Sequence, residues 1–180
     1  NEQNMGVNFS RNRALDNVSQ NSNWVIFLDD DDYLAPDALA TFRKLIATHQ
    51  NDNWFVTNRA YKDGHSLTLA PKNNNRFSYA LDYLILKRVK GDATHCIKTS
   101  EIKNVRFSRK ISQGDEWFFF YQLGLKNKFY YNNHHSTISE GYNTESGLNF
   151  RKLTKITKIK NTLKLLTEGL TKKITYHPSF

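Results

Sequence analysis

The sequence has a single cysteine and no long apolar run. Because Cys96 is alone among the 180 residues, no intrachain disulfide can form, and a reducing cytosol is the compartment we expect. No apolar stretch approaches the roughly 20 residues that a helix needs to cross a bilayer, and no charged segment followed by an apolar one opens the chain. We therefore expect a cytoplasmic protein with one compact domain and an appended element.

Acidic residues are also in the minority. The chain has 26 Lys and Arg against 17 Asp and Glu, a formal net charge of +9. Charge of this sign attracts phosphate, whether in nucleic acid, an anionic membrane surface or a sugar-nucleotide diphosphate. After Asn149 the lysines alternate with apolar residues that recur at three- and four-residue steps from Leu153 to Ile174. This pattern predicts a tail of basic amphipathic helices over 149–180, which either lies on the inner face of the plasma membrane or packs on a domain over 1–148.

Helix and strand patterns alternate through the rest of the chain. The continuous apolar run Trp24–Leu28 is typical of a strand buried on both faces of a parallel sheet. Ser10 can cap a helix over 11–19, and Pro36 suits the first position of the next helix. Further strands are predicted over 54–57, 93–98 and 129–131, and a further helix over 117–125. Such alternation predicts an α/β sandwich.

Four consecutive aspartates, Asp29 to Asp32, follow the Trp24–Leu28 run without a gap. Adjacent carboxylates repel one another, so a fold keeps them together only if something compensates. Ligands of open α/β sheets bind at the carboxyl ends of strands, and hard divalent cations take oxygen ligands. Asp29 and Asp31 are therefore candidates to hold a metal that bridges a diphosphate. The alternative is a solvated acidic turn in which one aspartate caps the following helix.

Three segments together resemble the bacterial glycosyltransferases of family 2, which have the GT-A fold. Asn4-Met-Gly-Val-Asn-Phe-Ser-Arg-Asn12 is similar to the family's N-x-G-x-x-x-A-R-N stretch. The segment from Trp24 to Leu39 is similar to its strand, L-D-x-D-D and P-x-x-L, and Gly114-Asp-Glu-Trp117 to its acidic pair before an aromatic residue. The resemblance implies a Rossmann-like nucleotide-diphospho-sugar transferase sandwich. The family's usual first strand is not in this sequence, so we expect an N-terminally truncated domain.

The resemblance also implies roles for individual residues. A Mg²⁺ or Mn²⁺ ion would be held by Asp31 with Asp29 nearby, and His134 or His135 would complete the metal shell or contact phosphate. One member of the acidic pair would be the general base: Glu116 by position, with Asp115 as the alternative because the order of the pair is reversed here. Trp117 either packs in the core or stacks on a sugar. The residues implied to contact substrate are Arg11, Asn12, Asp29, Asp30 and Trp117.

The expected activity is an inverting transfer of a sugar from a nucleotide-diphosphate donor to an acceptor hydroxyl. The donor is expected to be a UDP-sugar, and the acceptor a saccharide or a lipid-linked molecule in the synthesis of surface polysaccharide, lipopolysaccharide or capsule. The competing hypothesis is a noncatalytic basic module that binds anionic membrane or nucleic acid. Nucleic acid is the weaker of these partners, because the aromatic residues cluster in core-like runs such as Phe118 to Tyr121 and the aspartates would repel a polyanion.

Overall fold

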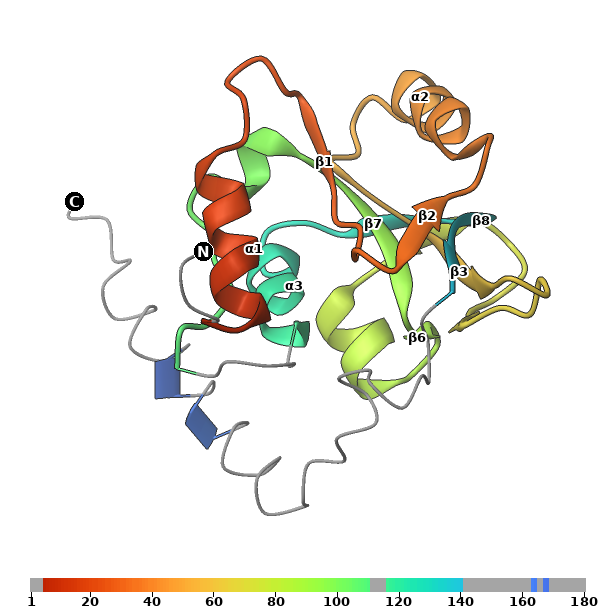
Figure 1. Ribbon diagram of the computed structural model, residues 1–180. Helices are drawn as coiled ribbons and strands as arrows, with labels where there is room; N and C mark the ends of the chain where they lie inside the picture. Colours follow the sequence, from red (N-terminus) through yellow and green to blue (C-terminus); the bar gives the residue numbers. More distant parts are fainter. Residues whose placement is uncertain (1–4, 111–115, 141–162, 165–166, 169–180) are drawn as a thin grey trace. The chain divides into compact units, whose positions relative to one another are not determined.

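The structure, a computed structural model, describes residues 5–110, 116–140, 163–164 and 167–168 (Figure 1). It divides into two compact units. Unit 1 comprises Asn1–Val18, Arg106–Phe119 and Arg151–Phe180, and unit 2 comprises Ser19–Val105 and Phe120–Phe150. Most of the predicted basic tail lies outside the described residues. Within the described part, no helix has both the length and the apolarity to span a membrane.

Unit 2 is built on a mixed sheet whose strands follow the order β1-β7-β3-β8-β2, with β5 also paired to β8. The central strands β3 and β8 run parallel, and the other pairs are antiparallel. The long strand β8 pairs with β5 near its start and with β2 near its end. A separate two-stranded sheet is formed by β4 and β6. The strands are β1 (Trp24–Ile26), β2 (Asp32–Leu34), β3 (Trp54–Tyr61), β4 (Thr68–Leu69), β5 (Asn75–Phe77), β6 (Lys90–Gly91), β7 (Ala93–Lys98) and β8 (Phe129–Ser139).

The first strand differs from the sequence-based prediction. Strand β1 ends at Ile26, is half-buried, and pairs antiparallel with β7 at one end of the described sheet. Residues 27–31 leave the strand, and Leu28 is 44% exposed. The prediction of a parallel strand buried on both faces was therefore wrong. An apolar run indicates burial, but it does not specify which strand becomes the neighbour or in which direction that neighbour runs.

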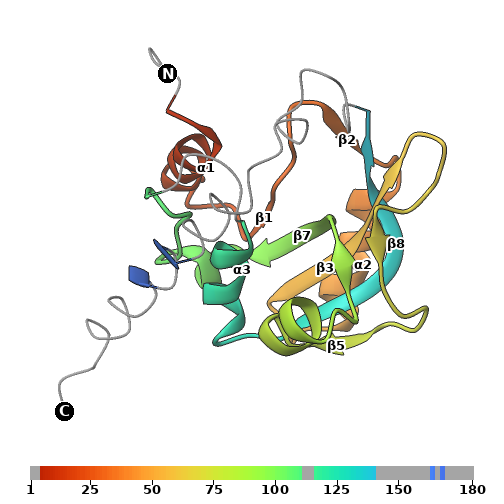
Figure 2. The same cartoon turned by 90° about the horizontal axis from the view of Figure 1, so that it is seen from below.

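Helix α2 (Ala38–Thr48) covers one face of the sheet and lies against β8 (Figure 2). Its buried residues Phe42 and Leu45 form a core cluster with Phe55 of β3 and Cys96 of β7. The helix begins two residues after Pro36, with Asp37 at the N-cap, so Pro36 precedes the helix and is not its first residue. Burial raises the pKa of the Cys96 thiol to about 12, which makes it a packing residue and not a nucleophile.

The opposite face of the sheet is packed with aromatic rings. Trp54 of β3 is fully buried. The centroid of its ring lies 5.3 Å from the ring centroid of Phe129 and 5.6 Å from that of Tyr79, which is in η1 (Tyr79–Ile85). The predicted helix over 117–125 is confirmed as α3 (Trp117–Gly124). A Cβ at Gly124 would lie 2.9 Å from the Cβ of Tyr79, so this close approach requires glycine.

Unit 1 contains α1 (Val7–Asp16), which starts four residues earlier than predicted. Gly6, with φ 84°, is the N-cap, a left-handed conformation that glycine adopts without strain. Ser10 therefore lies inside the helix, and its hydroxyl donates a hydrogen bond to the Gly6 carbonyl at 3.4 Å instead of capping the helix. The buried residues of α1, Asn8 and Asn12, are polar, so no apolar stripe marks where this helix begins.

Candidate active site

Three carboxylates of unit 2 come together between β1 and β2. A turn, closed by a hydrogen bond from the Asp32 amide to the Asp29 carbonyl (3.2 Å), folds the aspartate run back on itself. One oxygen from each of Asp29, Asp31 and Asp32 then lies within 4.8 Å of the others. Carboxylate oxygens at such distances match the preference of Mg²⁺ and Mn²⁺ for hard oxygen ligands. We refer to Asp29, Asp31 and Asp32 as the carboxylate group.

Members of the carboxylate group differ in exposure. Asp31 is exposed, and its side chain has no ion-pair or hydrogen-bond partner among the described residues. The Asp32 side chain is 1% exposed and sits in β2 opposite Ser139 of β8. Burial raises the pKa of Asp32 above its ordinary value, against the lowering effects of the Ser139 hydroxyl and of Arg59. Asp30 is exposed and lies outside the group.

Arg59 of β3 is a component of this site that the sequence analysis missed. Its guanidinium is ion-paired through Nη2 with the Asp32 carboxylate, and Nη1 lies 3.6 Å from Asp29 Oδ2. Nη2 also donates a hydrogen bond to the Ser139 hydroxyl at 3.2 Å. In the sequence, an arginine inside the mostly buried strand Trp54–Tyr61 could have indicated an ion pair, because an arginine is rarely buried without an acidic partner.

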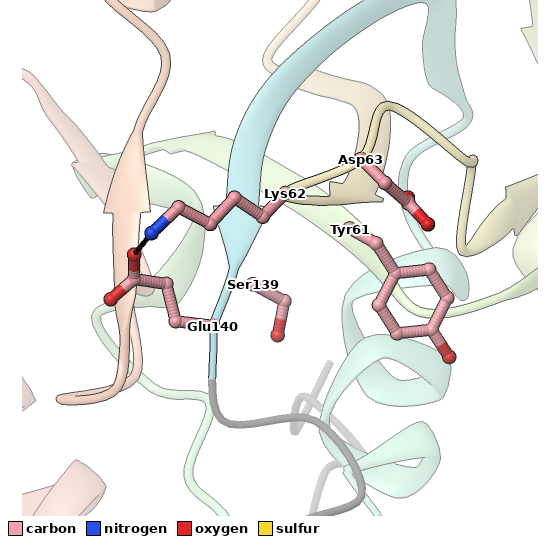
Figure 3. A pocket seen from close by; sticks show the side chains of 5 residues that line it. All are labelled: Tyr61, Lys62, Asp63, Ser139 and Glu140. Atoms are coloured by element: carbon pink, nitrogen blue, oxygen red, sulfur yellow. Dashed lines mark hydrogen bonds and ion pairs between the residues drawn. The ribbon is translucent and has the colours of Figure 1, made fainter.

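Next to this site lies an open hollow of about 340 Å³ (Figure 3). It is lined by Tyr61 and Lys62 at the end of β3, Asp63 after it, and Ser139 and Glu140 at the end of β8. The Lys62 ammonium donates to the Glu140 carboxylate at 2.7 Å, and the two side chains are 73% and 49% exposed. Ser139 lines the hollow and also contacts the carboxylate site, because its hydroxyl accepts a hydrogen bond from Arg59, which is paired with Asp32.

The two histidines lie within β8, which extends well past the strand predicted over 129–131. His134 bonds Asp37 through Nε2 and Ser136 through Nδ1, both at 3.0 Å. His135 is paired with Asn58 of β3, at an irregularity in the register of the parallel strands. Neither histidine is a member of the carboxylate group among the described residues. The third member of the carboxylate group is Asp32, which was not among the residues expected to bind metal.

In unit 1, two residues from the matched motifs come together. Arg11 Nη1 lies 2.5 Å from Glu116 Oε1, although 105 positions separate them in the chain. The Arg11 side chain is 17% exposed and lies over the Phe107 ring, while Glu116 is 44% exposed. Arg11 was expected to contact substrate, and the structure pairs it with the expected base, Glu116.

Asn12 is 1% exposed and holds a backbone segment in place. Its amide nitrogen donates to the Phe107 carbonyl at 2.9 Å, and its amide oxygen accepts from the Phe107 N–H at 2.8 Å. One turn earlier, the Asn8 amide donates to the Ser108 carbonyl at 3.2 Å. Asn12 was expected to contact substrate; in the structure its side chain is buried, and both of its polar atoms bond the Phe107 backbone. We expect these bonds to position the segment.

We expect Asn12→Ala to lower the free energy of unfolding by about 2–4 kcal/mol, because a buried N–H and a buried C=O of Phe107 lose their partners. Urea denaturation followed by circular dichroism measures the change. The matched control is Asn17→Ala, an exposed asparagine at the end of α1 that donates to the Arg13 carbonyl at 2.8 Å. We expect the control to cost less than about 1 kcal/mol, and equal losses for the two variants would contradict the positioning role.

The other two members of the acidic motif are less fully defined. Trp117, the first residue of α3, is half-buried, with its ring 5.8 Å from that of Phe118 in an edge arrangement. Its indole packs against Phe118, and the residue remains partly exposed. Asp115 lies outside the described residues.

A mixed, curled sheet flanked by helices, with carboxylates in the turn after one strand, is the arrangement of a GT-A glycosyltransferase. The chain belongs to glycosyl transferase family 2, whose family model matches residues 1–137. Among solved structures it is similar to residues 1–349 of TarS from S. aureus, with a TM-score of 0.57 and 16% sequence identity. That match covers 76% of this chain and 40% of the TarS chain. A comparison with curated proteins gave no match.

Proposed function

We propose that this glycosyltransferase is metal-dependent and inverting. It would move a sugar from a nucleotide-diphosphate donor, a UDP-sugar, to a hydroxyl of a saccharide or lipid-linked acceptor in the synthesis of surface polysaccharide, lipopolysaccharide or capsule. The observation that carries the proposal is the carboxylate group, in which three oxygen donors lie within 4.8 Å of one another on a family 2 chain. A divalent ion bound there would neutralise charge on the departing nucleoside diphosphate.

In this proposal, Asp31 and Asp29 bind Mg²⁺ or Mn²⁺, because they are the more exposed members of the group. Sugar transfer also needs a base that takes the proton of the acceptor hydroxyl as its oxygen attacks the anomeric carbon. Attack on the side opposite the leaving group inverts that carbon. We assign this role to Glu116, with Asp115 as the alternative. Arg11 supports the assignment of Glu116, since an ion pair at 2.5 Å fixes the orientation of its carboxylate.

We also propose that the protein works in the cytoplasm at the inner face of the membrane, with the lysines of residues 149–180 against anionic headgroups. The net charge of +9 and the concentration of lysines after Asn149 support this location. A sedimentation assay with anionic and neutral vesicles tests it directly.

A thermal-shift and donor-hydrolysis screen tests the proposed function. The chain is heated with each of several UDP-sugars, with Mn²⁺, and with both together. We expect the melting temperature to rise most with both ligands, because a diphosphate and a metal share one site, and we expect at least one donor to be hydrolysed only when metal is present. No shift and no hydrolysis with any donor would contradict the proposal. A shift caused by oligonucleotides or anionic vesicles alone would favour the noncatalytic module instead.

A further inference from the structure

Arg59 reaches from one strand of the sheet across its neighbour to the carboxylate group. It lies on β3 opposite Thr137 of β8, and β8 in turn pairs with β2, which carries Asp32. The guanidinium therefore spans the width of β8 to reach Asp32, and it bonds Ser139 on the way. With 15% of its side chain exposed, Arg59 is held between strands and is not a mobile surface residue.

A buried carboxylate without a cation nearby is unfavourable, and here three carboxylates share one small volume. Asp32, at 1% exposure, is the member least able to be solvated, and it is the one that Arg59 contacts most closely. Contact with Asp29 is looser, at 3.6 Å, and no described cation contacts Asp31. The positive charge is thus placed at one side of the group and not at its centre.

This asymmetry divides the group into two parts. Asp32 is ion-paired with Arg59 and lies opposite Ser139 in the sheet. We expect these neighbours to hold its carboxylate in place whether or not an ion is present. Asp31 and the 40%-exposed Asp29 face solvent. An ion arriving from solvent meets Asp31 and Asp29 first, and it is repelled by the Arg59 charge from the Asp32 side.

We propose that Arg59 is an internal cation that neutralises Asp32. Asp32 is then not a ligand of the divalent ion, which binds to Asp31 and Asp29. The inference rests on the proposed metal-dependent function and assigns a positioning residue to the same site. Removing Arg59 destabilises the metal-free protein, because Asp32 loses its partner, yet tightens metal binding, because one positive charge is gone and one carboxylate is released.

The test compares Arg59→Met with the wild-type chain by titrating MnCl₂ alone and following free Mn²⁺ by electron paramagnetic resonance. We expect the Kd for Mn²⁺ to fall about tenfold and the melting temperature in EDTA to fall by several degrees. The matched control is Arg76→Met. Arg76 is also paired with a buried carboxylate, Asp52, through two 2.7 Å contacts, but it pairs with Tyr130 near the other end of β8. This control should lose stability without any change in Mn²⁺ affinity.

The charge-balanced variant Arg59→Met/Asp32→Asn keeps the test valid if the single variant fails to fold. It removes both members of the ion pair, so we expect it to fold and to bind Mn²⁺ within about threefold of the wild-type Kd, because Asp29 and Asp31 are intact. Loss of Mn²⁺ binding in this variant would make Asp32 a ligand and overturn the inference.

Two further outcomes separate this inference from the proposed function. An unchanged or raised Kd in folded Arg59→Met, with a wild-type chain that binds Mn²⁺ and hydrolyses donor, overturns only the role of Arg59. Absence of Mn²⁺ binding by the wild-type chain overturns both the inference and the proposed metal dependence.

Discussion

Replacing Asp31 by Asn is expected to lower the kcat/KM of sugar transfer by about 10²–10³, equivalent to a loss of about 3–4 kcal/mol of transition-state stabilisation. Asn keeps the shape of the side chain and one oxygen, but it removes the negative charge that holds a divalent ion. The Asp31 side chain is exposed and has no ion-pair or hydrogen-bond partner among the described residues, so the substitution breaks no described ion pair and the fold should be preserved. Initial rates over a range of Mn²⁺ concentrations measure the effect.

Asp92→Asn is the matched control for this prediction. Asp92 lies between β6 and β7, is partly exposed, and is not a member of the carboxylate group. The control removes the same charge, so it reports any effect of net charge alone, and we expect less than a twofold change in rate. If Asp31→Asn retains more than about a third of the wild-type rate at every Mn²⁺ concentration, Asp31 is not the main metal ligand.

Acid is expected to destabilise unit 2 through His95. This residue of β7 is buried, and burial lowers the pKa of its imidazole from 6.5 to about 3. Its Nδ1 accepts a hydrogen bond from Trp54 Nε1 at 3.1 Å, and its ring stacks on Phe120 at 3.8 Å. The folded state therefore requires the neutral ring, with the Trp54 bond identifying Nδ1 as the nitrogen without a proton.

Between about pH 6.5 and pH 3 the unfolded chain binds a proton at His95 that the folded chain excludes, so the free energy of unfolding falls as the pH falls. The loss reaches at most on the order of 4 kcal/mol by pH 3, and above pH 6.5 the dependence disappears. Urea denaturation at a series of pH values measures it.

A neutral replacement isolates this contribution from other titrating groups. His95→Gln retains an oxygen that can accept from Trp54, so we expect a chain that is less stable at pH 7 but loses much less stability between pH 6 and pH 4 than wild type. His65→Gln, at a histidine whose side chain is 82% exposed, should leave the wild-type pH dependence unchanged. Equal pH dependence in wild type and His95→Gln would show that another group causes the acid sensitivity.

Local sequence was sufficient for several features of this protein. The aspartate run after Trp24–Leu28 led to the carboxylate group, and the resemblance to family 2 is confirmed over residues 1–137. The strongly apolar helix after Glu116 and the strand over 93–98 were also predicted correctly. These features depend on residues that are neighbours in the chain, and short patterns of burial and charge specify them.

Other features depend on residues that only the fold makes neighbours. The pairing of Arg59 with Asp32 requires the order β3-β8-β2 and a register that sets Ser139 beside Asp32. The pairing of Arg11 with Glu116 joins positions 105 apart. Strand direction and register are set by the packing of the whole sheet, so a single sequence identifies the charged residues but not their partners. The sequence by itself determined the family and the aspartates, and the tertiary structure decided which of those carboxylates is already neutralised by an arginine.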